Sequence, residues 1–282
     1  MADALKGQVA IVTGGGTGLG RGIAVELAKE GAHVVVASRG LEHLKDGVSA
    51  IEQAGGTASA HQVDVRDADA VQAMVDTTVR EHGRLDILVN NAAGNFVLPA
   101  EEYTPNGWRT IVDIVVNGTF LCSWAAGRHW IEAQHPGAIL NVVSTHIYSG
   151  CPGLAASAAS KAAVANLTQT LAVEWGAYGI RVNGLAPGVF PNPTVQAQMH
   201  PEESIEDAYA RAAKVVPLGR AGEVWELGRA AVFLCGPDGA YVSGHTLVMD
   251  GANWLRRGHL TPEYKTVPQQ IAERGMPKRE KR

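Results

Sequence analysis

The segment Gln8-Val-Ala-Ile-Val-Thr-Gly-Gly-Gly-Thr-Gly-Leu-Gly-Arg21 decides the fold. Its first six residues are apolar and β-branched, which is typical of a short buried strand. Five glycines follow within seven positions, and apolar residues then recur at helical spacing over Arg21–Glu30. A strand, a glycine turn and a helix in this order predict a dinucleotide-binding motif. Glycines let the backbone approach a pyrophosphate, whose charge lies at the helix N-terminus.

The glycine turn has the spacing Gly14-x-x-x-Gly18-x-Gly20 rather than the Gly-x-Gly-x-x-Gly form. A glycine cluster alone also fits a plain structural turn, so its position between a strand and a helix carries the interpretation. The turn supplies the first predicted cofactor contacts: Gly14, Thr17, Gly18, Leu19 and Gly20.

The second predicted strand, His33–Ser38, is followed by Arg39, and no acidic residue lies between His33 and Leu41. An acidic side chain at this strand end would bind the ribose hydroxyls and repel a 2′-phosphate. Ser38 and Arg39 can instead bind a phosphate, which favours NADPH over NADH. The alternative is that Arg39 is an ordinary solvated charge. A third strand ends at Asp64-Val65, where Asp64 is expected near the adenine. Val65, and Asn91 and Ala92 farther along the chain, are further predicted cofactor contacts.

Strand and helix patterns alternate along the rest of the chain, which predicts the α/β class: one doubly wound Rossmann-type domain with a central parallel sheet flanked by helices. We expect this dinucleotide-binding and catalytic domain to span residues 1–255 and a C-terminal extension to span 256–282. The strands are expected at residues 8–13, 33–38, 58–65, 86–89, 137–143, 181–186 and 245–250, and the helices at 21–30, 42–54, 68–82, 104–134, 154–176, 205–215 and 223–234.

Composition narrows the class of protein. The 282 residues carry a net charge of −4, which disfavours a nucleic-acid partner bound through bulk charge. Three widely spaced cysteines form neither a metal pattern nor a disulfide framework, and the first residues contain no apolar signal segment. We therefore expect a cytoplasmic protein without a structural metal. We also expect no membrane span, because no stretch approaches ~20 apolar residues.

Two further stretches place polar groups where predicted strands end. Asn91 and Ala92 follow the fourth strand, and Asn91 is expected either to tie neighbouring strands or to act in the site. Asp113 and Asn117 lie four apart on one face of a long helix, and Gly118 predicts a kink that turns Asn117 inward. The segment 141–161 then carries hydroxyls, an imidazole, a phenol and an ammonium in one strand-to-helix passage.

These motifs together resemble the short-chain dehydrogenase/reductase family over about residues 5–255. The resemblance implies that Lys161 binds the nicotinamide ribose, that Ser144 holds substrate, and that Pro187 and Gly188 border the cofactor. It rests on Thr13-Gly14-x-x-x-Gly18-x-Gly20, Asp64, Asn90-Asn91-Ala92, Asn117, Ser144, Lys161 and Pro187-Gly188. The family's usual tyrosine lies four residues before the lysine, where this chain has Ser157. A second branch places it seven before the lysine, where Leu154 stands.

One branch that carries a serine at this position is similar in further segments: the NADPH-dependent 2,4-dienoyl-CoA reductases. The similar segments are 91–96, 104–108, 113–120 and 171–176. The resemblance implies a homotetramer, an acyl-CoA substrate bound near Asn95 and Phe96, and catalytic roles for Asn117 and Lys161.

The branch's oxygen-binding tyrosine has no clear match. In ungapped register its position is His146, and Tyr148 lies two residues on. Either His146 or Tyr148 supplies the donor, and we favour Tyr148 because a phenol donates reliably at neutral pH. The competing hypotheses are a reductase of another enoyl or carbonyl substrate, and a cofactor-binding subunit that has lost catalysis.

Overall fold

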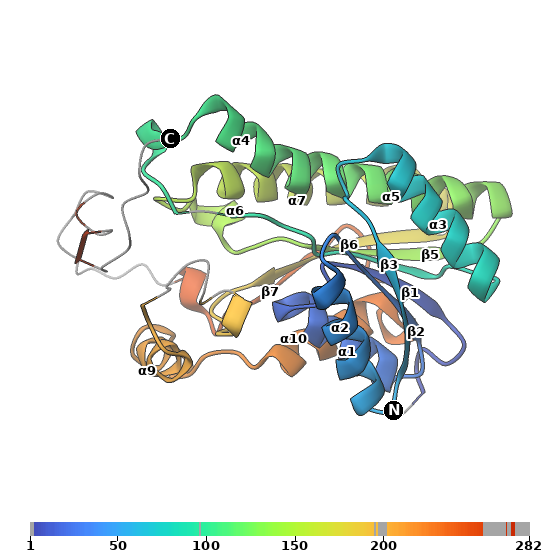
Figure 1. The fold of residues 1–282 in the computed structure, drawn as a ribbon, viewed down its shortest axis with the longest axis horizontal. Coiled ribbons are helices and arrows are strands. Elements are labelled where there is room, and N and C mark those ends of the chain that lie inside the picture. Colours follow the sequence, from blue (N-terminus) through green and yellow to red (C-terminus); the bar gives the residue numbers. More distant parts are fainter. Residues whose placement is uncertain are drawn as a thin grey trace.

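A computed structural model describes residues 3–95, 97–194, 196, 202–255, 269, 272 and 273 of the chain. Seven parallel strands form one sheet in the order β3-β2-β1-β4-β5-β6-β7 (Figure 1). The predicted α/β class and doubly wound parallel sheet are confirmed. The strands are β1 (Val9–Thr13), β2 (His33–Ser38), β3 (Thr57–Gln62), β4 (Ile87–Asn90), β5 (Gly137–Val142), β6 (Ile180–Pro187) and β7 (Thr246–Met249).

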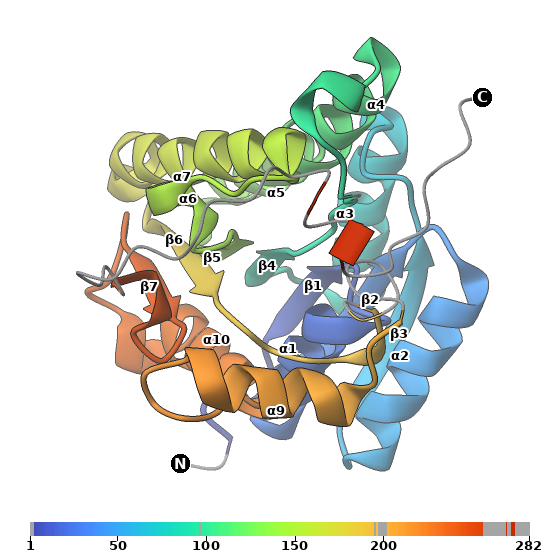
Figure 2. The ribbon, with the colours of Figure 1, turned by 90° about the vertical axis from the view of Figure 1, so that its left-hand side faces the viewer.

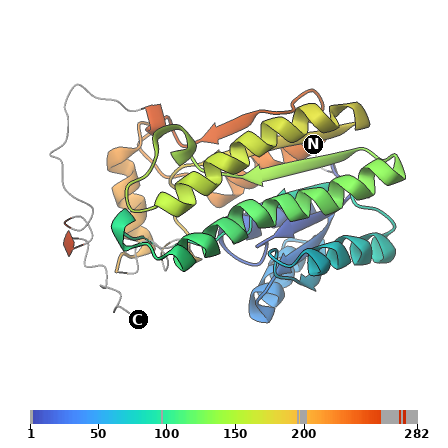
Figure 3. The same cartoon turned by 90° about the horizontal axis from the view of Figure 1, so that it is seen from above.

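Helices cover both faces of the sheet, with α1, α2 and α10 on one face and α3, α5 and α7 on the other (Figure 1). Seen from above, α5 and α7 run alongside each other (Figure 3). The helices are α1 (Gly18–Lys29), α2 (Leu41–Gln53), α3 (Ala68–His82), α4 (Pro105–Val112), α5 (Gly118–Ala133), α6 (His146–Ser149), α7 (Ala155–Trp175), α9 (Ile205–Val215) and α10 (Val224–Cys235), with a π-helical turn η2 (Asp113–Asn117) and short 3-10 turns η1 (Ala100–Glu102), η3 (Gly176–Tyr178), η4 (Pro237–Gly239) and η5 (Asn253–Leu255).

The core forms two layers, one on each side of the sheet. Ala10 and Val12 of β1 pack toward α1 and α10, whereas Val9 and Ile11 pack toward the opposite helices. Every residue of β1 is buried. Burial on both faces explains why this strand is a continuous apolar run rather than an alternating one.

Two local features differ from the predicted elements, and a third agrees with them. The third strand ends at Gln62 rather than Val65, because β3 is an edge strand that pairs only with β2, through Gln62. Asp64 and Val65 therefore lie in the loop that follows. The segment after β5 contains the one-turn helix α6, which the sequence did not predict. The long helix predicted over residues 104–134 is present, but η2 interrupts it at the expected kink.

The continuous helical run Pro105–Ala133 has the length and apolar composition that would suffice to cross a membrane. Buried helices in the cores of globular proteins satisfy the same two criteria, and half of its most apolar window is buried in this structure. Trp130 shows how the run packs: its side chain is fully buried, and Nε1 donates to the Leu85 carbonyl at 2.7 Å. This helix is therefore a core element of the described fold.

A buried polar network holds β4 and β5 to the helices above them. Asn90 Nδ2 donates to Ser123 Oγ of α5 at 3.0 Å and to Asn141 Oδ1 of β5 at 2.9 Å. Asn141 Nδ2 donates to Thr168 Oγ1 of α7 at 2.9 Å, and Thr168 in turn donates to the Val164 carbonyl at 2.8 Å. Partnered polar groups at this depth specify one packing arrangement, because any slip leaves a buried donor without an acceptor.

The strand order reverses between β1 and β4, which places a ligand crevice at their carboxyl ends. Figure 2 looks onto this edge of the sheet, with α6 on one side and α9 on the other. The domain boundary at residue 255 stays a prediction, since most of the segment 256–282 lies outside the described residues.

Candidate cofactor and substrate site

A cavity of about 580 Å³ lies at the reversal point of the sheet. It is lined by eleven of the residues predicted to bind the cofactor, which come from four separate strand ends: Gly14, Thr17, Gly18, Leu19, Gly20, Ser38, Arg39, Asp64, Val65, Asn91 and Ala92. The predicted contacts Lys161, Pro187 and Gly188 are not among its lining residues. The sequence missed several lining residues, including His43, Ile114, Asn192 and Thr194.

The glycine turn can pack closely against β4 and α2 because it lacks side chains. Gly14 and Gly18 adopt φ values of +64° and +53°, which L-residues with side chains rarely adopt. A Cβ at Gly20 would lie 2.3 Å from both Asn91 Nδ2 and the Gly14 carbonyl oxygen. A Cβ at Gly16 would lie 2.0 Å from the His43 carbonyl oxygen. This last contact explains why His43 of α2 borders the cavity. No local sequence motif predicts this position of His43.

Thr13 and Asn91 join the glycine turn to β4. Thr13 Oγ1 donates to the Val89 carbonyl at 3.2 Å and accepts from the backbone N–H groups of Asn91 and Ala92 at 3.0 and 3.1 Å. The Asn91 amide donates to the carbonyls of Thr13 and Gly14 at 3.0 and 3.2 Å. Of the two roles expected for Asn91, the structure therefore shows the strand-tying one.

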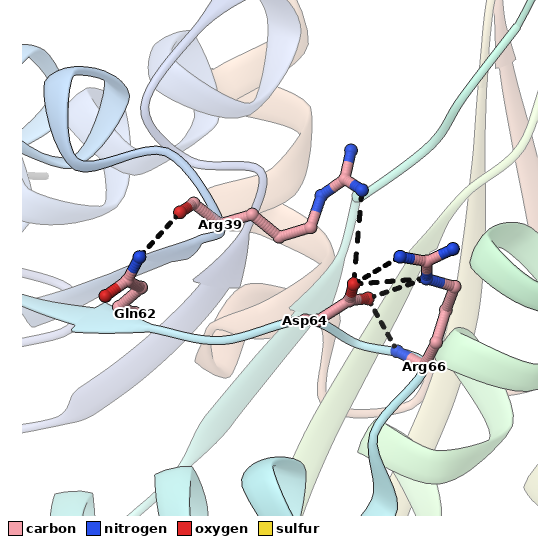
Figure 4. Close-up of polar contacts among 4 residues, drawn as sticks. All are labelled: Arg39, Gln62, Asp64 and Arg66. Carbon is pink, nitrogen blue, oxygen red and sulfur yellow. Dashed lines mark hydrogen bonds and ion pairs between the residues drawn. The ribbon is translucent and has the colours of Figure 1, made fainter.

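Two arginines meet one carboxylate at the outer end of the cavity (Figure 4). Arg66 Nη2 lies 2.5 Å from Asp64 Oδ2, and Arg39 Nη1 lies 4.0 Å from the same oxygen. The hydrogen bond from Arg66 holds the pKa of Asp64 below its ordinary value. Asp113 also interacts with Arg66 through its charge, so Arg39 is the guanidinium here that is least compensated. Asp64 was predicted to lie near the adenine. The structure shows that its carboxylate is already paired with Arg66, a contact that was not predicted.

The side chain of Arg39 is 63% exposed and reaches toward Asp64 from the end of β2 (Figure 4). Gln62 Nε2 fixes its backbone by donating to the Arg39 carbonyl at 2.9 Å. Ser38 Oγ donates to the Gly40 carbonyl at 3.3 Å, so it must release that bond before it can donate to a phosphate. A largely exposed guanidinium beside a hydroxyl is the donor set that an additional phosphate requires.

Lys161 is buried at the start of α7, with 8% of its surface exposed. Its Nζ donates to the Val142 carbonyl at the end of β5 at 2.5 Å. Burial lowers the pKa of Lys161 to about 8, because the charged ammonium loses its hydration. One backbone acceptor therefore holds the ammonium close to the strand end. Any further polar partner would stabilise its charged form.

The residues predicted to meet substrate lie in and beside α6. Ser144 Oγ is buried and has no hydrogen-bond partner among the described residues, so it is a polar group that a ligand can satisfy. Burial lowers the pKa of His146, which keeps this imidazole neutral at pH 7. Tyr148 is 42% exposed, and its ring stacks on Trp254 with centroids 4.7 Å apart.

Asn117 lies at the end of the π-helical turn, where the kink expected from Gly118 is present. A Cβ at Gly118 would lie 2.6 Å from Val65 Cγ2, so the absent side chain lets the turn approach the loop after β3. Asn117 Nδ2 donates to Asp113 Oδ1 at 2.8 Å, which confirms their shared face. The side chain of Asn117 is exposed rather than turned into the core as we expected.

The remaining predicted contacts are only partly described. Asn95 is half-buried after β4, and Phe96 lies outside the described residues. Gly188 packs against Asp250, since a Cβ there would lie 2.3 Å from Asp250 Cβ. Part of the segment between Gly188 and Ser204 is also outside the described residues. In the described ranges no three His, Cys, Asp or Glu side chains gather in a way that could hold a metal ion.

Comparison with known proteins agrees with this geometry. A family model described as "Enoyl-(Acyl carrier protein) reductase" matches residues 14–252. The chain belongs to the short-chain dehydrogenase/reductase family. The resemblance drawn from its motifs is therefore confirmed, and the chain is an oxidoreductase of this family.

Two relatives and one solved structure are similar over most of their length. The chain is 43% identical to "Probable 2,4-dienoyl-CoA reductase [(2E)-enoyl-CoA-producing]" of Bacillus subtilis, over 89% of this chain and 98% of the relative. It is 39% identical to "Peroxisomal 2,4-dienoyl-CoA reductase [(3E)-enoyl-CoA-producing]" of Arabidopsis thaliana, over 93% and 89%. A gluconate 5-dehydrogenase from Burkholderia cenocepacia, in complex with NADP and tartrate, superposes with a TM-score of 0.81 at 33% identity, covering 90% of this chain and 97% of that one.

The burial of Lys161 predicts a specific pH dependence of stability. Its pKa of about 8 in the folded chain is below the ~10.4 expected of an unfolded chain. Between these values the unfolded chain binds more protons, so stability rises with pH. We expect the free energy of unfolding of the wild type, minus that of Lys161→Met, to increase by about 2 kcal/mol from pH 8 to pH 10.

Urea unfolding at several pH values measures this difference. Lys45→Met, which removes a largely exposed lysine, is the matched control, and its difference from wild type should stay flat over the same range. A flat difference for Lys161→Met as well would show that the buried ammonium keeps an ordinary pKa.

Proposed function

We propose that the chain reduces 2,4-dienoyl-CoA thioesters with NADPH, as a step in the β-oxidation of unsaturated fatty acids. The observation that carries the proposal is the residue four positions before Lys161. It is Ser157, not tyrosine, in a chain that is 43% identical to a relative named as a dienoyl-CoA reductase. An acyl-CoA substrate, a homotetrameric assembly and a cytoplasmic location belong to the same proposal, supported by the family resemblance and the composition.

The described residues fit a dinucleotide. The glycine turn lines the cavity of about 580 Å³, and α1 begins there at Gly18. The largely exposed guanidinium of Arg39 supports a cofactor with a 2′-phosphate, as does the NADP bound in the similar gluconate dehydrogenase. Lys161 would hold the nicotinamide ribose through its ammonium. When bound, the cofactor supplies a hydride for the far end of the diene.

The chain's own residues then act on the thioester oxygen. As the conjugated system accepts electrons, negative charge collects on that oxygen, and hydrogen-bond donors aimed at it lower the barrier. His146 is neutral at pH 7 and can donate one N–H, and Asn117 can donate through the second N–H of its amide while the first binds Asp113. Ser144 offers a buried hydroxyl without a protein partner among the described residues. Burial of His146 and exposure of Tyr148 now favour His146 as the donor.

A proton must finally reach carbon. Protonation of the dienolate at C2 leaves the double bond at position 3, whereas protonation at C4 leaves it at position 2. The two relatives are named for these two different products. Which product this chain forms is decided by where the proton donor stands relative to the bound dienolate.

Mixing purified protein with NADPH and 2,4-hexadienoyl-CoA tests the proposed reaction. Absorbance of the nicotinamide and of the diene should fall together, one equivalent each. Crotonyl-CoA and a panel of simple ketones serve as alternative substrates. Turnover of those compounds without turnover of the dienoyl thioester would point to a different reductase. Binding of NADPH with no turnover of any compound would indicate a cofactor-binding subunit.

Arg39→Asp tests the choice of cofactor. The carboxylate repels a 2′-phosphate and can bind the ribose hydroxyls instead, so the preference should move from NADPH toward NADH. We expect kcat/KM for NADPH to fall at least tenfold, about 1.4 kcal/mol, with a gain for NADH. The matched control Arg128→Asp removes an exposed arginine on α5 and should leave both values unchanged. An unaltered preference in Arg39→Asp would mean that this arginine is only a solvated charge.

The oxygen donor is assigned by two single substitutions, His146→Phe and Tyr148→Phe. Loss of the donor should lower kcat at least tenfold, about 1.4 kcal/mol, because the bond matters most in the transition state. We expect this loss in His146→Phe and less than a threefold change in Tyr148→Phe, which keeps the stacked ring. The reverse result would assign the phenol, and no loss in either variant would remove both residues from catalysis.

A further inference from the structure

The residues after β7 make a tight turn, Asp250–Leu255, here called the C-terminal turn. Its backbone is unusual, since Gly251 and Ala252 both have positive φ, at +62° and +68°. Ala252 is one of few non-glycine residues in this conformation, which L-residues seldom adopt. Such a conformation persists only where the surroundings impose it, and it often marks a functional position.

Contacts on three sides impose this conformation. Asp250 is buried, and its Oδ2 accepts from the Trp254 backbone N–H at 2.6 Å. Gly188, at the end of β6, lies so close that a Cβ there would touch Asp250. A Cβ at Gly251 would lie 2.5 Å from Val216 Cγ1, which follows α9. The C-terminal turn is therefore wedged against the end of β6, next to the predicted nicotinamide contacts.

The contacts of the C-terminal turn fix the position of Trp254. Its indole stacks on the ring of Tyr148 with centroids 4.7 Å apart and an interplanar angle of 29°. Tyr148 belongs to α6, a helix of four residues, and so short a helix is not stable by itself. On its other side α6 is held by Ile147, which packs against the core cluster that includes Val143 and Ala156.

His146 lies directly before these two anchors in the chain. It directly precedes Ile147, and Tyr148 follows one residue later. The imidazole is largely buried although α6 itself has no fully buried residue. An aromatic stack on one side and an aliphatic contact on the other thus hold a one-turn helix in a fixed orientation, and the buried imidazole depends on that orientation.

We propose that Trp254 is a positioning residue, which acts through Tyr148 to clamp α6 and thereby hold His146 at the substrate oxygen. The effect on turnover rests on the proposed function, whereas the effect on His146 itself does not. The clamp explains why the chain retains a strained residue at position 252: the strained turn after β7 places the indole against Tyr148.

Accessibility of His146 tests the clamp without any substrate. Diethyl pyrocarbonate modifies neutral, exposed imidazoles, and peptide mass spectrometry follows each histidine separately. We expect His146 to react at least fivefold faster in Trp254→Ala than in the wild type, since loss of the stack frees α6. Trp254→Phe, which can still stack, should restore the slow rate. Trp225→Ala, which removes an exposed indole of α10, is the matched control and should react like the wild type.

Tyr148→Ala removes the same stack from its other partner and should speed the modification of His146 equally. This variant also guards against a failure of Trp254→Ala to fold, because Tyr148 is largely exposed. An unchanged rate of modification in both variants would overturn the clamp. So would a Trp254→Phe variant that reacts as fast as Trp254→Ala.

Kinetics supply the second readout. We expect kcat for 2,4-hexadienoyl-CoA to fall about tenfold in Trp254→Ala, ~1.4 kcal/mol, with the affinity for NADPH unchanged. The double variant Tyr148→Ala/Trp254→Ala should lose no more than either single variant, as one shared contact requires. Fully additive losses would contradict the clamp. A wild type without dienoyl-CoA turnover would refute the proposed function and leave the modification experiment to decide the clamp.

Discussion

The hydroxyl of Thr13 is the point on which the site depends. At the reversal of strand order β1 and β4 lie side by side, but their following loops must diverge to opposite faces of the sheet. One hydroxyl bridges the divergence by donating to β4 and accepting two N–H groups from the loop after it. The amide of Asn91 closes the arrangement by returning two bonds to the glycine turn. Because the turn is held by β4, it keeps its open shape without side chains of its own.

Buried polar side chains farther along β4 and β5 also hold the site in place. The Nδ2 groups of Asn90 and Asn141 donate to Asn141 Oδ1 and to hydroxyls from α5 and α7. Lys161 projects from α7 onto the end of β5, and its burial makes the charged form costly. The network fixes the position of α7 relative to the sheet. It therefore also fixes the depth at which the ammonium of Lys161 stands.

Patterns local in sequence predicted most of the fold and the cofactor half of the site. Buried strands read as apolar runs, glycines marked the turn, and eleven predicted contacts line one cavity. Features that arise from contacts distant in the chain were not predicted. The approach of Gly16 to His43 and the stacking of Tyr148 on Trp254 join residues with no shared motif. Helix α6 was missed because four residues carry too little periodicity to identify a helix. The sequence did not predict that β3 ends at Gln62. The reason is that a change from apolar to polar residues does not mark the residue at which an edge strand stops pairing.

The absence of tyrosine at position 157 follows from the chemistry proposed for this site. Reduction of a carbonyl places the hydride on the carbon that bears the oxygen, and the resulting alkoxide must receive a proton, so an acid is needed at that oxygen. Reduction of a conjugated thioester places the hydride several bonds away, and the oxygen carries charge only until carbon is protonated. Such an oxygen needs hydrogen-bond donors rather than an acid. A neutral imidazole whose pKa is lowered by burial, a carboxamide and a hydroxyl meet that need. Selection for a phenol beside Lys161 then disappears, and a serine is sufficient at position 157.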